Sequence, residues 1–176
     1  MRAAGVSYVI LGALRHGPKS GYEIKQLVDK ATRFFWAASY GQIYPELRRL
    51  EEDGLVEGSE ERSGGRRRIP YQLTAAGRRE LEDWLREPSA GYELRDEGLL
   101  KLFFADVLEH EDALALVRTF KRERQAVLER LRAVEAGLPA GASGFPLVVL
   151  AYGLELHEWE IDWCSRLERR LEEEAR

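Results

Sequence analysis

The sequence predicts a mainly α-helical protein with one small β-hairpin, organised in two domains. Three observations support this fold class. Apolar residues recur with helical spacing through most of the 176 residues, two short alternating segments flank a Gly64-Gly65 turn, and a stretch with Pro88 and Gly91 separates regions of opposite charge. We therefore expect a first domain over residues 1–87, a linker over 88–95 and a helical domain over 96–176.

Composition excludes several classes of protein. Hydrophobic residues make up 44% and charged residues 33% of the chain, which is typical of a globular protein rich in surface helices. The single cysteine, Cys164, rules out a disulfide framework within one chain. No apolar run approaches the roughly 20 residues that span a bilayer. Ser7 and Arg15 interrupt the apolar N-terminus, so we expect no cleaved signal and a cytoplasmic location.

The first domain reads as three helices, a hairpin and a fourth helix. Ser20 and Thr74 are suited to cap helices, and Asp53-Gly54 is suited to end one. In order, the expected elements are helices over 6–16, 21–32 and 39–53, strands within 55–61 and 68–74, and a helix over 75–87. Three helices followed by a β-hairpin form the plan of a winged helix-turn-helix, in which the third helix enters the major groove of DNA.

The third helix carries a proline near its start. Ile43, Leu47 and Leu50 share the apolar face, whereas Pro45 lies where a helix interior would be damaged. We expect the helix to begin near Gln42, which would place Pro45 in the first turn and bias Tyr44 away from helical geometry toward a phosphate. A kinked helix that begins at Ser39 is the alternative.

The distribution of charge favours a DNA partner for the first domain, although the whole chain has a net charge of −4. Residues 1–86 contain 15 Lys/Arg and 12 Asp/Glu, a net of +3, and residues 87–176 have a net of −7. Gln and Arg on the outer side of the third helix suit base edges. A solvated face, with Arg48 paired to Glu51 or Glu52, is the alternative. Three arginines lie beside the glycine turn. Binding to phosphates explains them better than the alternative role, which is to keep the edge of the sheet soluble.

Residues 8–77 resemble the PadR family of bacterial transcriptional regulators. The resemblance rests on the order and spacing of "YVILGAL", "SGYEI", "SYGQIYPELRRLEEDGLV" and "RRRIPYQLTAAG". It implies a homodimer that binds an inverted-repeat operator and usually represses, with release by a small molecule in some members. It also implies that the start of the third helix meets DNA. The predicted DNA-binding residues are Lys19, Ser39, Tyr40, Gln42, Tyr44, Arg48, Arg49, Arg66, Arg67 and Arg68.

The second domain is expected to contain helices over 97–108, 112–136 and 145–173. The last helix has two apolar stripes side by side, so one can pack within the chain and the other needs a partner. Self-association is the economical explanation, because two-fold DNA half-sites require a two-fold protein. A monomeric bundle that hides both stripes is the alternative. The predicted dimerisation residues are Leu147, Leu150, Leu154, Ile161 and Leu171.

Aromatic residues and two potential metal ligands remain to be explained. Ordinary packing accounts for the aromatic residues most simply, and an effector cavity is the sharper hypothesis. The residues proposed for that cavity are Trp36, Phe103, Phe104, Tyr152, Trp159 and Trp163. His157 and Cys164 from each of two chains would provide the four ligands of a zinc ion. The simpler interpretation, which we favour, is a buried histidine and an inert buried cysteine. We therefore expect no metal and no cofactor.

Catalysis finds little support in the sequence. His16, His110 and His157 lie on different elements, and no nucleophile or phosphate-loop motif is present. We therefore expect a sequence-specific transcriptional regulator, a repressor, rather than an enzyme. A winged-helix module that contacts proteins without binding DNA is the alternative.

Overall fold

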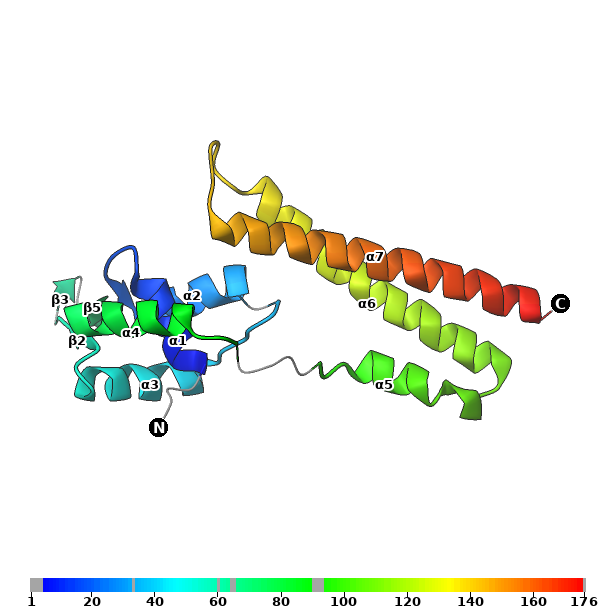
Figure 1. Ribbon diagram of the computed structural model, residues 1–176, viewed down its shortest axis with the longest axis horizontal. Coiled ribbons are helices and arrows are strands. Elements are labelled where there is room, and N and C mark those ends of the chain that lie inside the picture. The colour runs from blue at the N-terminus through cyan, green and yellow to red at the C-terminus, as the bar shows by residue number, and fades with distance from the viewer. Residues whose placement is uncertain (1–4, 33, 60, 64–65, 90–93, 176) are drawn as a thin grey trace. The chain divides into compact units, whose positions relative to one another are not determined.

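The computed structural model describes residues 5–32, 34–59, 61–63, 66–89 and 94–175, and of 61–63 and 66–68 it describes the backbone alone. The chain folds as two compact units, Met1–Gly91 and Tyr92–Arg176 (Figure 1). The first unit combines helices with short strands, and the second consists of helices in its described part. The mainly helical fold class with a small hairpin is thereby confirmed.

The helices of the first unit begin and end at the expected residue types. Ser20 caps its helix by accepting the Glu23 N–H at 3.4 Å, while its own N–H donates to Glu23 Oε2 at 2.8 Å. Thr74 accepts the Gly77 N–H at 3.0 Å, and Gly54 follows the third helix with φ of +70°. The helices are α1 (Gly5–Leu14), α2 (Gly21–Leu27), its π-helical continuation (Val28–Thr32), α3 (Tyr40–Glu52) and α4 (Ala75–Arg86).

A small antiparallel sheet carries the predicted hairpin. The central strand pairs with a neighbour on each side, and Val56 lies opposite Leu73. The hairpin continues in a second pair of strands, in which Arg62 lies opposite Arg67. The strands are β1 (Lys19–Ser20), β2 (Val56–Gly58), β3 (Glu61–Ser63), β4 (Arg66–Arg68) and β5 (Pro70–Leu73), in the orders β1-β5-β2 and β3-β4. The pattern of the sequence did not indicate β1.

The core of the first unit lies between α1, α2, α3 and the sheet. Ile43, Leu47 and Leu50 are fully buried, so the predicted inner face of α3 is confirmed. They pack with Ile10, Leu11, Ile24, Val28 and Val56. Helix α4 approaches this core closely at Gly77, where a Cβ would lie 1.9 Å from the Leu55 carbonyl oxygen. Only glycine permits that approach.

The second unit is organised around two long antiparallel helices. Arg118 bonds to Glu168 and to Glu172, each at 2.6 Å, and Arg132 bonds to Glu158 at 2.8 Å, so the helices run in opposite directions. Between them Val117, Phe120 and Cys164 form a buried cluster. The elements are α5 (Glu97–Phe103), a 3₁₀ turn (Ala105–Val107), α6 (His110–Ala136) and α7 (Phe145–Glu174).

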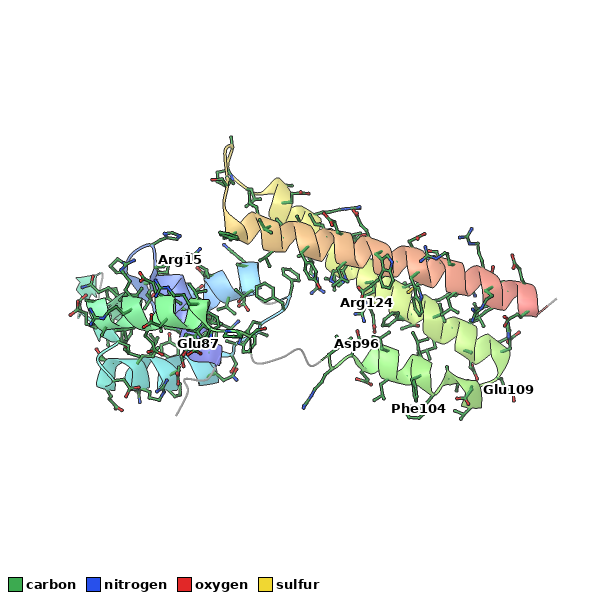
Figure 2. All side chains as sticks on the ribbon, in the orientation of Figure 1. Arg15, Glu87, Asp96, Phe104, Glu109 and Arg124 are labelled. Carbon is green, nitrogen blue, oxygen red and sulfur yellow. The ribbon has the colours of Figure 1, made fainter. Side chains whose placement is uncertain are left out.

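The start of α5 is fixed on α6. Asp96 caps α5 by accepting the N–H groups of Gly98 and Leu99 at 2.8 and 3.1 Å. Its carboxylate also pairs with Arg124 of α6, toward which it points in Figure 2. The Arg124 guanidinium lies 4.2 Å from the centre of the Phe120 ring.

No helix in the described part of the chain is long and apolar enough to cross a membrane.

The two apolar stripes of α7 have different environments. The stripe that contains Cys164 packs on α6, and Leu171 contacts the buried cluster. Its other members, Leu147, Leu150, Leu154 and Ile161, are half-buried within the single chain. On the opposite side, Tyr152 and Trp159 are 65% and 59% exposed, and Phe145, Val148 and Val149 are exposed beside them. All five residues that we predicted to lie at a dimer interface therefore belong to the stripe that packs on α6.

Candidate nucleic-acid interface

Helix α3 begins earlier than expected. Its first residue is Tyr40, preceded by Ser39, whose carbonyl accepts the N–H groups of Gln42 and Ile43 at 3.1 and 3.0 Å. The expectation that the helix begins near Gln42 is therefore wrong, and so is the expectation that Tyr44 leaves helical geometry. Pro45 lies in the second turn and has no N–H to donate to the Gly41 carbonyl.

A pair of tyrosines occupies the exposed start of α3. Tyr40 and Tyr44 are each 44% exposed, and their rings stack with centroids 6.1 Å apart. The Tyr44 ring packs on Gly21 of α2, where a Cβ would lie 2.7 Å from the ring. Lys25, also on α2, places its Nζ 5.5 Å from the centre of the Tyr40 ring. Two hydroxyls on rings that α2 supports are suited to bind phosphate oxygens.

Gln42 is exposed, but one end of its amide is already occupied. Its Oε1 accepts the Ser39 N–H at 3.0 Å and the Ser39 hydroxyl at 3.1 Å. The side chain thus helps to cap its own helix, as a residue at the third helical position commonly does. Its Nε2 takes no part in this cap, and paired recognition of adenine through both ends of the amide would require release of the cap.

Arg48 and Arg49 are neighbours in sequence but not in environment. Arg49 bonds to Glu46 at 2.6 Å and to Asp53 at 2.7 Å, whereas no salt bridge to the exposed Arg48 occurs among the described residues. The helix-surface pairing that we considered for Arg48 therefore involves Arg49. The bonded Arg49 holds the pKa of the Glu46 carboxyl below its usual range, and Glu46 raises the pKa of Arg49. Sequence reasoning did not connect either residue with α1.

The remaining basic residues belong to β1, α2 and β4. Lys19 belongs to β1 rather than to a helix, and its Nζ donates to the Gly17 carbonyl at 3.4 Å. Lys25 pairs with Asp29. Arg66, Arg67 and Arg68 form β4, and their side chains lie outside what the structure describes. The predicted DNA-binding residues other than these three thus come from β1 and from α3 with its cap.

An apolar cavity of about 240 Å³ lies within the first unit. Trp36, which we predicted for an effector site, forms part of its wall and packs on Gly5, where a Cβ would lie 1.9 Å from the ring. Arg15, labelled in Figure 2, is also among the lining residues. Sequence reasoning missed most of the wall, because it comes from both ends of the domain. Its other members include Tyr8, Val9, Gly12, Phe35 and Trp84.

The other predicted effector residues belong to the second unit. Phe103 is the last residue of α5, and Phe104 caps its C-terminus. Their side chains are 76% and 57% exposed and contact each other edge to face. Tyr152 and Trp159 lie on the exposed stripe of α7, and Trp163 packs against the buried cluster. None of these five residues lines the cavity of the first unit.

The two potential zinc ligands have other roles. His157 Nδ1 lies 2.6 Å from Glu160 Oε2. Cys164 is fully buried, and burial raises the pKa of its thiol, which disfavours the thiolate that metals bind. Among the described residues, no group of three or more suitable side chains could hold a metal ion.

Family models match both halves of the chain. Residues 10–83 match the transcriptional regulator PadR-like family, and residues 94–172 match the model described as virulence activator alpha C-term. The first match runs from within α1 to within α4, and the second runs from before α5 to near the end of α7.

Individual relatives match over nearly the full length. The negative transcriptional regulator PadR of Bacillus subtilis is 31% identical over 172 residues, which cover 92% of this chain and 94% of that protein. The structure of Bacillus subtilis PadR in complex with operator DNA superposes with a TM-score of 0.87 at 30% identity, covering 96% of this chain and 99% of that one. Its complex with p-coumaric acid gives 0.79 at 28% identity, covering 97% and 99%. This chain belongs to the PadR-like family and is a DNA-binding transcriptional regulator, not an enzyme.

Proposed function

We propose that this chain is a repressor that binds an inverted-repeat operator as a homodimer and is released by a small aromatic ligand. The observation that carries the proposal is the exposed start of α3, where Tyr40 and Tyr44 stack on a helix whose opposite face is fully buried. A relative described as a negative regulator, whose structure with operator DNA has been determined, supports it.

The DNA-binding residues divide by role. Ser39, Tyr40, Tyr44 and Lys19 provide hydroxyl and ammonium groups that suit phosphates. Gln42 and Arg48 are also exposed on α3, and side chains of a helix in the major groove meet base edges. The arginines of β4 extend the hairpin and bind the phosphate backbone beside the site. Arg49 differs from all of these residues, because its charge is already paired within α3.

The homodimer forms through the exposed side of α7. Tyr152, Leu156 and Trp159 recur there at helical spacing, and a large exposed apolar patch on one chain is typical of an interface. Without this interface, two separate protomers would have to bind the two half-sites independently. A two-fold protein instead places one α3 in each half-site of an inverted repeat.

The aromatic ligand binds in the cavity of the first unit. Its wall is mainly apolar, with Tyr8 and Trp84 stacked at 4.2 Å between ring centroids, and a planar ligand suits such a wall. Arg15 provides a cation that suits a carboxylate. That a relative binds p-coumaric acid, a phenolic acid of this chemistry, supports the proposal.

Salt dependence tests the DNA-binding proposal. A duplex is first selected by the protein from a random-sequence pool, and its dissociation constant is measured between about 50 and 200 mM salt. Replacing Arg66, Arg67 and Arg68 with alanine should weaken binding and flatten the log–log slope by about 0.9 for each phosphate that the variant no longer neutralises. Gln42→Glu keeps an acceptor for the helix cap but removes the amide donor, so it should change the preferred sequence at one or two positions.

The two variants have distinct failure modes. An unchanged slope in the triple variant would contradict the role of the wing. A uniform loss of affinity for Gln42→Glu across duplex sequences would make Gln42 a backbone contact. If the wild-type protein selects no sequence, the proposed function itself is wrong.

A further inference from the structure

Arg49 is bonded through all three of its guanidinium nitrogens. Nε donates to Glu46 Oε2 at 3.0 Å, Nη2 donates to Glu46 Oε1 at 2.6 Å, and Nη1 donates to Asp53 Oδ2 at 2.7 Å. The contact with Glu46 is a two-point pair, the strongest arrangement for an arginine and a carboxylate. Asp53 caps the C-terminus of α3, so this one side chain joins the middle of the helix to its end.

The same group reaches across to α1. Ser7 is fully buried, and its hydroxyl donates to Glu46 Oε1. In turn, Arg49 Nη2 donates to the Ser7 hydroxyl at 3.1 Å. Ser7 is the buried polar side chain in the described core of this unit, and both of its side-chain partners come from α3. The side chain of Glu46 is only 15% exposed, so water competes poorly for this contact.

Arg48 provides the natural comparison. It is exposed and has no salt bridge within the described part of the chain, so its charge is available to a ligand. Arg49 commits four of its five N–H donors to Glu46, Asp53 and Ser7, so a two-point contact with a phosphate would require it to give up some of these bonds. Loss of the Glu46 contact would leave this half-buried carboxylate with the Ser7 hydroxyl as its one remaining donor from the group.

We propose that Arg49 and Glu46 are positioning residues rather than DNA contacts: with Ser7 they anchor α3 on α1 and fix the rotation at which α3 presents its exposed face. This inference rests on the proposed function and revises our prediction that Arg49 binds DNA. It assigns a DNA-binding role to Arg48 and a supporting role to the next residue. The exposed face carries Tyr40, Gln42 and Tyr44, which a turn of the helix about its axis would displace together.

The test compares two adjacent arginines. Arg48→Gln and Arg49→Gln remove the same charge one residue apart, and each is assayed on the selected duplex across the same range of salt. Arg48→Gln should reduce the log–log slope by about one for each bound protomer. Arg49→Gln should weaken binding at least tenfold at every salt concentration while its slope stays that of the wild type. A reduced slope for Arg49→Gln, or wild-type affinity, overturns the proposal.

Glu46→Gln gives the sharper contrast. It removes a negative charge from the DNA-binding unit, so simple electrostatics predicts tighter binding. A positioning role predicts that Glu46→Gln binds DNA more weakly at an unchanged slope. It also predicts that the double variant with Arg49→Gln binds DNA no more weakly than the weaker of the two single variants. Tighter binding by Glu46→Gln overturns the proposal.

Two further variants guard against loss of folding. Arg49→Lys keeps the charge but not the two-point geometry, so it should not restore affinity, whereas a phosphate contact would be restored. Ser7→Ala leaves every surface charge in place and should still weaken DNA binding at an unchanged slope. Thermal unfolding confirms that each variant is folded at the assay temperature. A chain that selects no duplex at all overturns the proposed function together with this inference, whereas the Arg49 and Glu46 outcomes overturn this inference alone.

Discussion

Gly12 is the residue at which the cavity can be closed with least disturbance. It lies within α1 and lines the cavity, and a Cβ at this position would meet no atom within 4 Å. Gly12→Phe should therefore attach a ring at an open point of the cavity wall and occupy the space of the ligand. Because glycine is a poor helix former, phenylalanine or alanine at this position should also stabilise α1, by up to about 1 kcal/mol. The variant should keep its affinity for operator DNA and lose its response to a phenolic acid.

The measurement is a thermal shift with p-coumaric acid, because a ligand that binds only the native state raises the melting temperature. Gly12→Ala is the matched control, since one methyl group leaves most of the cavity open. We expect a shift for the wild type and for Gly12→Ala and none for Gly12→Phe. An equal shift in all three proteins would place the ligand elsewhere.

Single residues also show where sequence reasoning stops. The inward positions Ile43, Leu47 and Leu50 were predictable, because helical spacing alone puts them on one face. Arg48 and Arg49 were not distinguishable, because both have acidic residues at helical spacing, and the contact that also joins Arg49 to α1 is with Ser7, 42 residues away along the chain. Local spacing contains no information about such a partner. The same limit hid the cavity, whose wall joins Tyr8 to Trp84.

Among the elements, α3 retains a proline at a position that weakens it. Pro45 is exposed in the second turn, and the Gly41 carbonyl receives no helical N–H from it. Pro45→Ala should therefore stabilise the protein, by about 1–3 kcal/mol, since proline in a helix interior costs about 3 kcal/mol relative to alanine and less near an end. Urea denaturation measures the change, with an unchanged m-value expected.

Glu52→Ala is a suitable control, because Glu52 is also exposed on α3 and alanine there should change stability by less than about 0.5 kcal/mol. A loss of stability in Pro45→Ala would contradict this account. It would mean that the proline supports packing that the helix needs.

Element types were easier to predict than their limits. The helices and the main hairpin follow from apolar spacing, caps and the glycine turn. Strand β1 contains only Lys19 and Ser20 and is defined by backbone pairing with Tyr71 and Pro70, so no side-chain alternation could indicate it. The start of α3 was misplaced because the proline was given more weight than the Ser39 cap.

For the whole molecule, we expect the exposed side of α7 to form the interface of the proposed homodimer. The side of α7 that contains Cys164 is already packed on α6, whereas Tyr152 and Trp159 remain exposed in one chain. We expect sedimentation to show a species of twice 20.2 kDa for the wild type. Trp159→Glu places a charge within the exposed stripe, where burial against a partner would be costly, and should yield a monomer.

The monomer should bind operator DNA far more weakly, because two linked half-site contacts gain affinity from their high effective concentration. Arg169→Glu is the control, since it changes a charge on another side of α7 and should leave the dimer intact. Trp159→Glu should not destabilise the core of the protomer, because the Trp159 side chain is 59% exposed in the single chain. The melting temperature of the isolated protomer should therefore not fall. If Trp159→Glu still sediments as a dimer and binds operator DNA as the wild type does, the exposed stripe is not the interface. In that case the half-buried side of α7, with Leu147, Leu150, Leu154, Ile161 and Leu171, would have to contact the partner while it packs on α6.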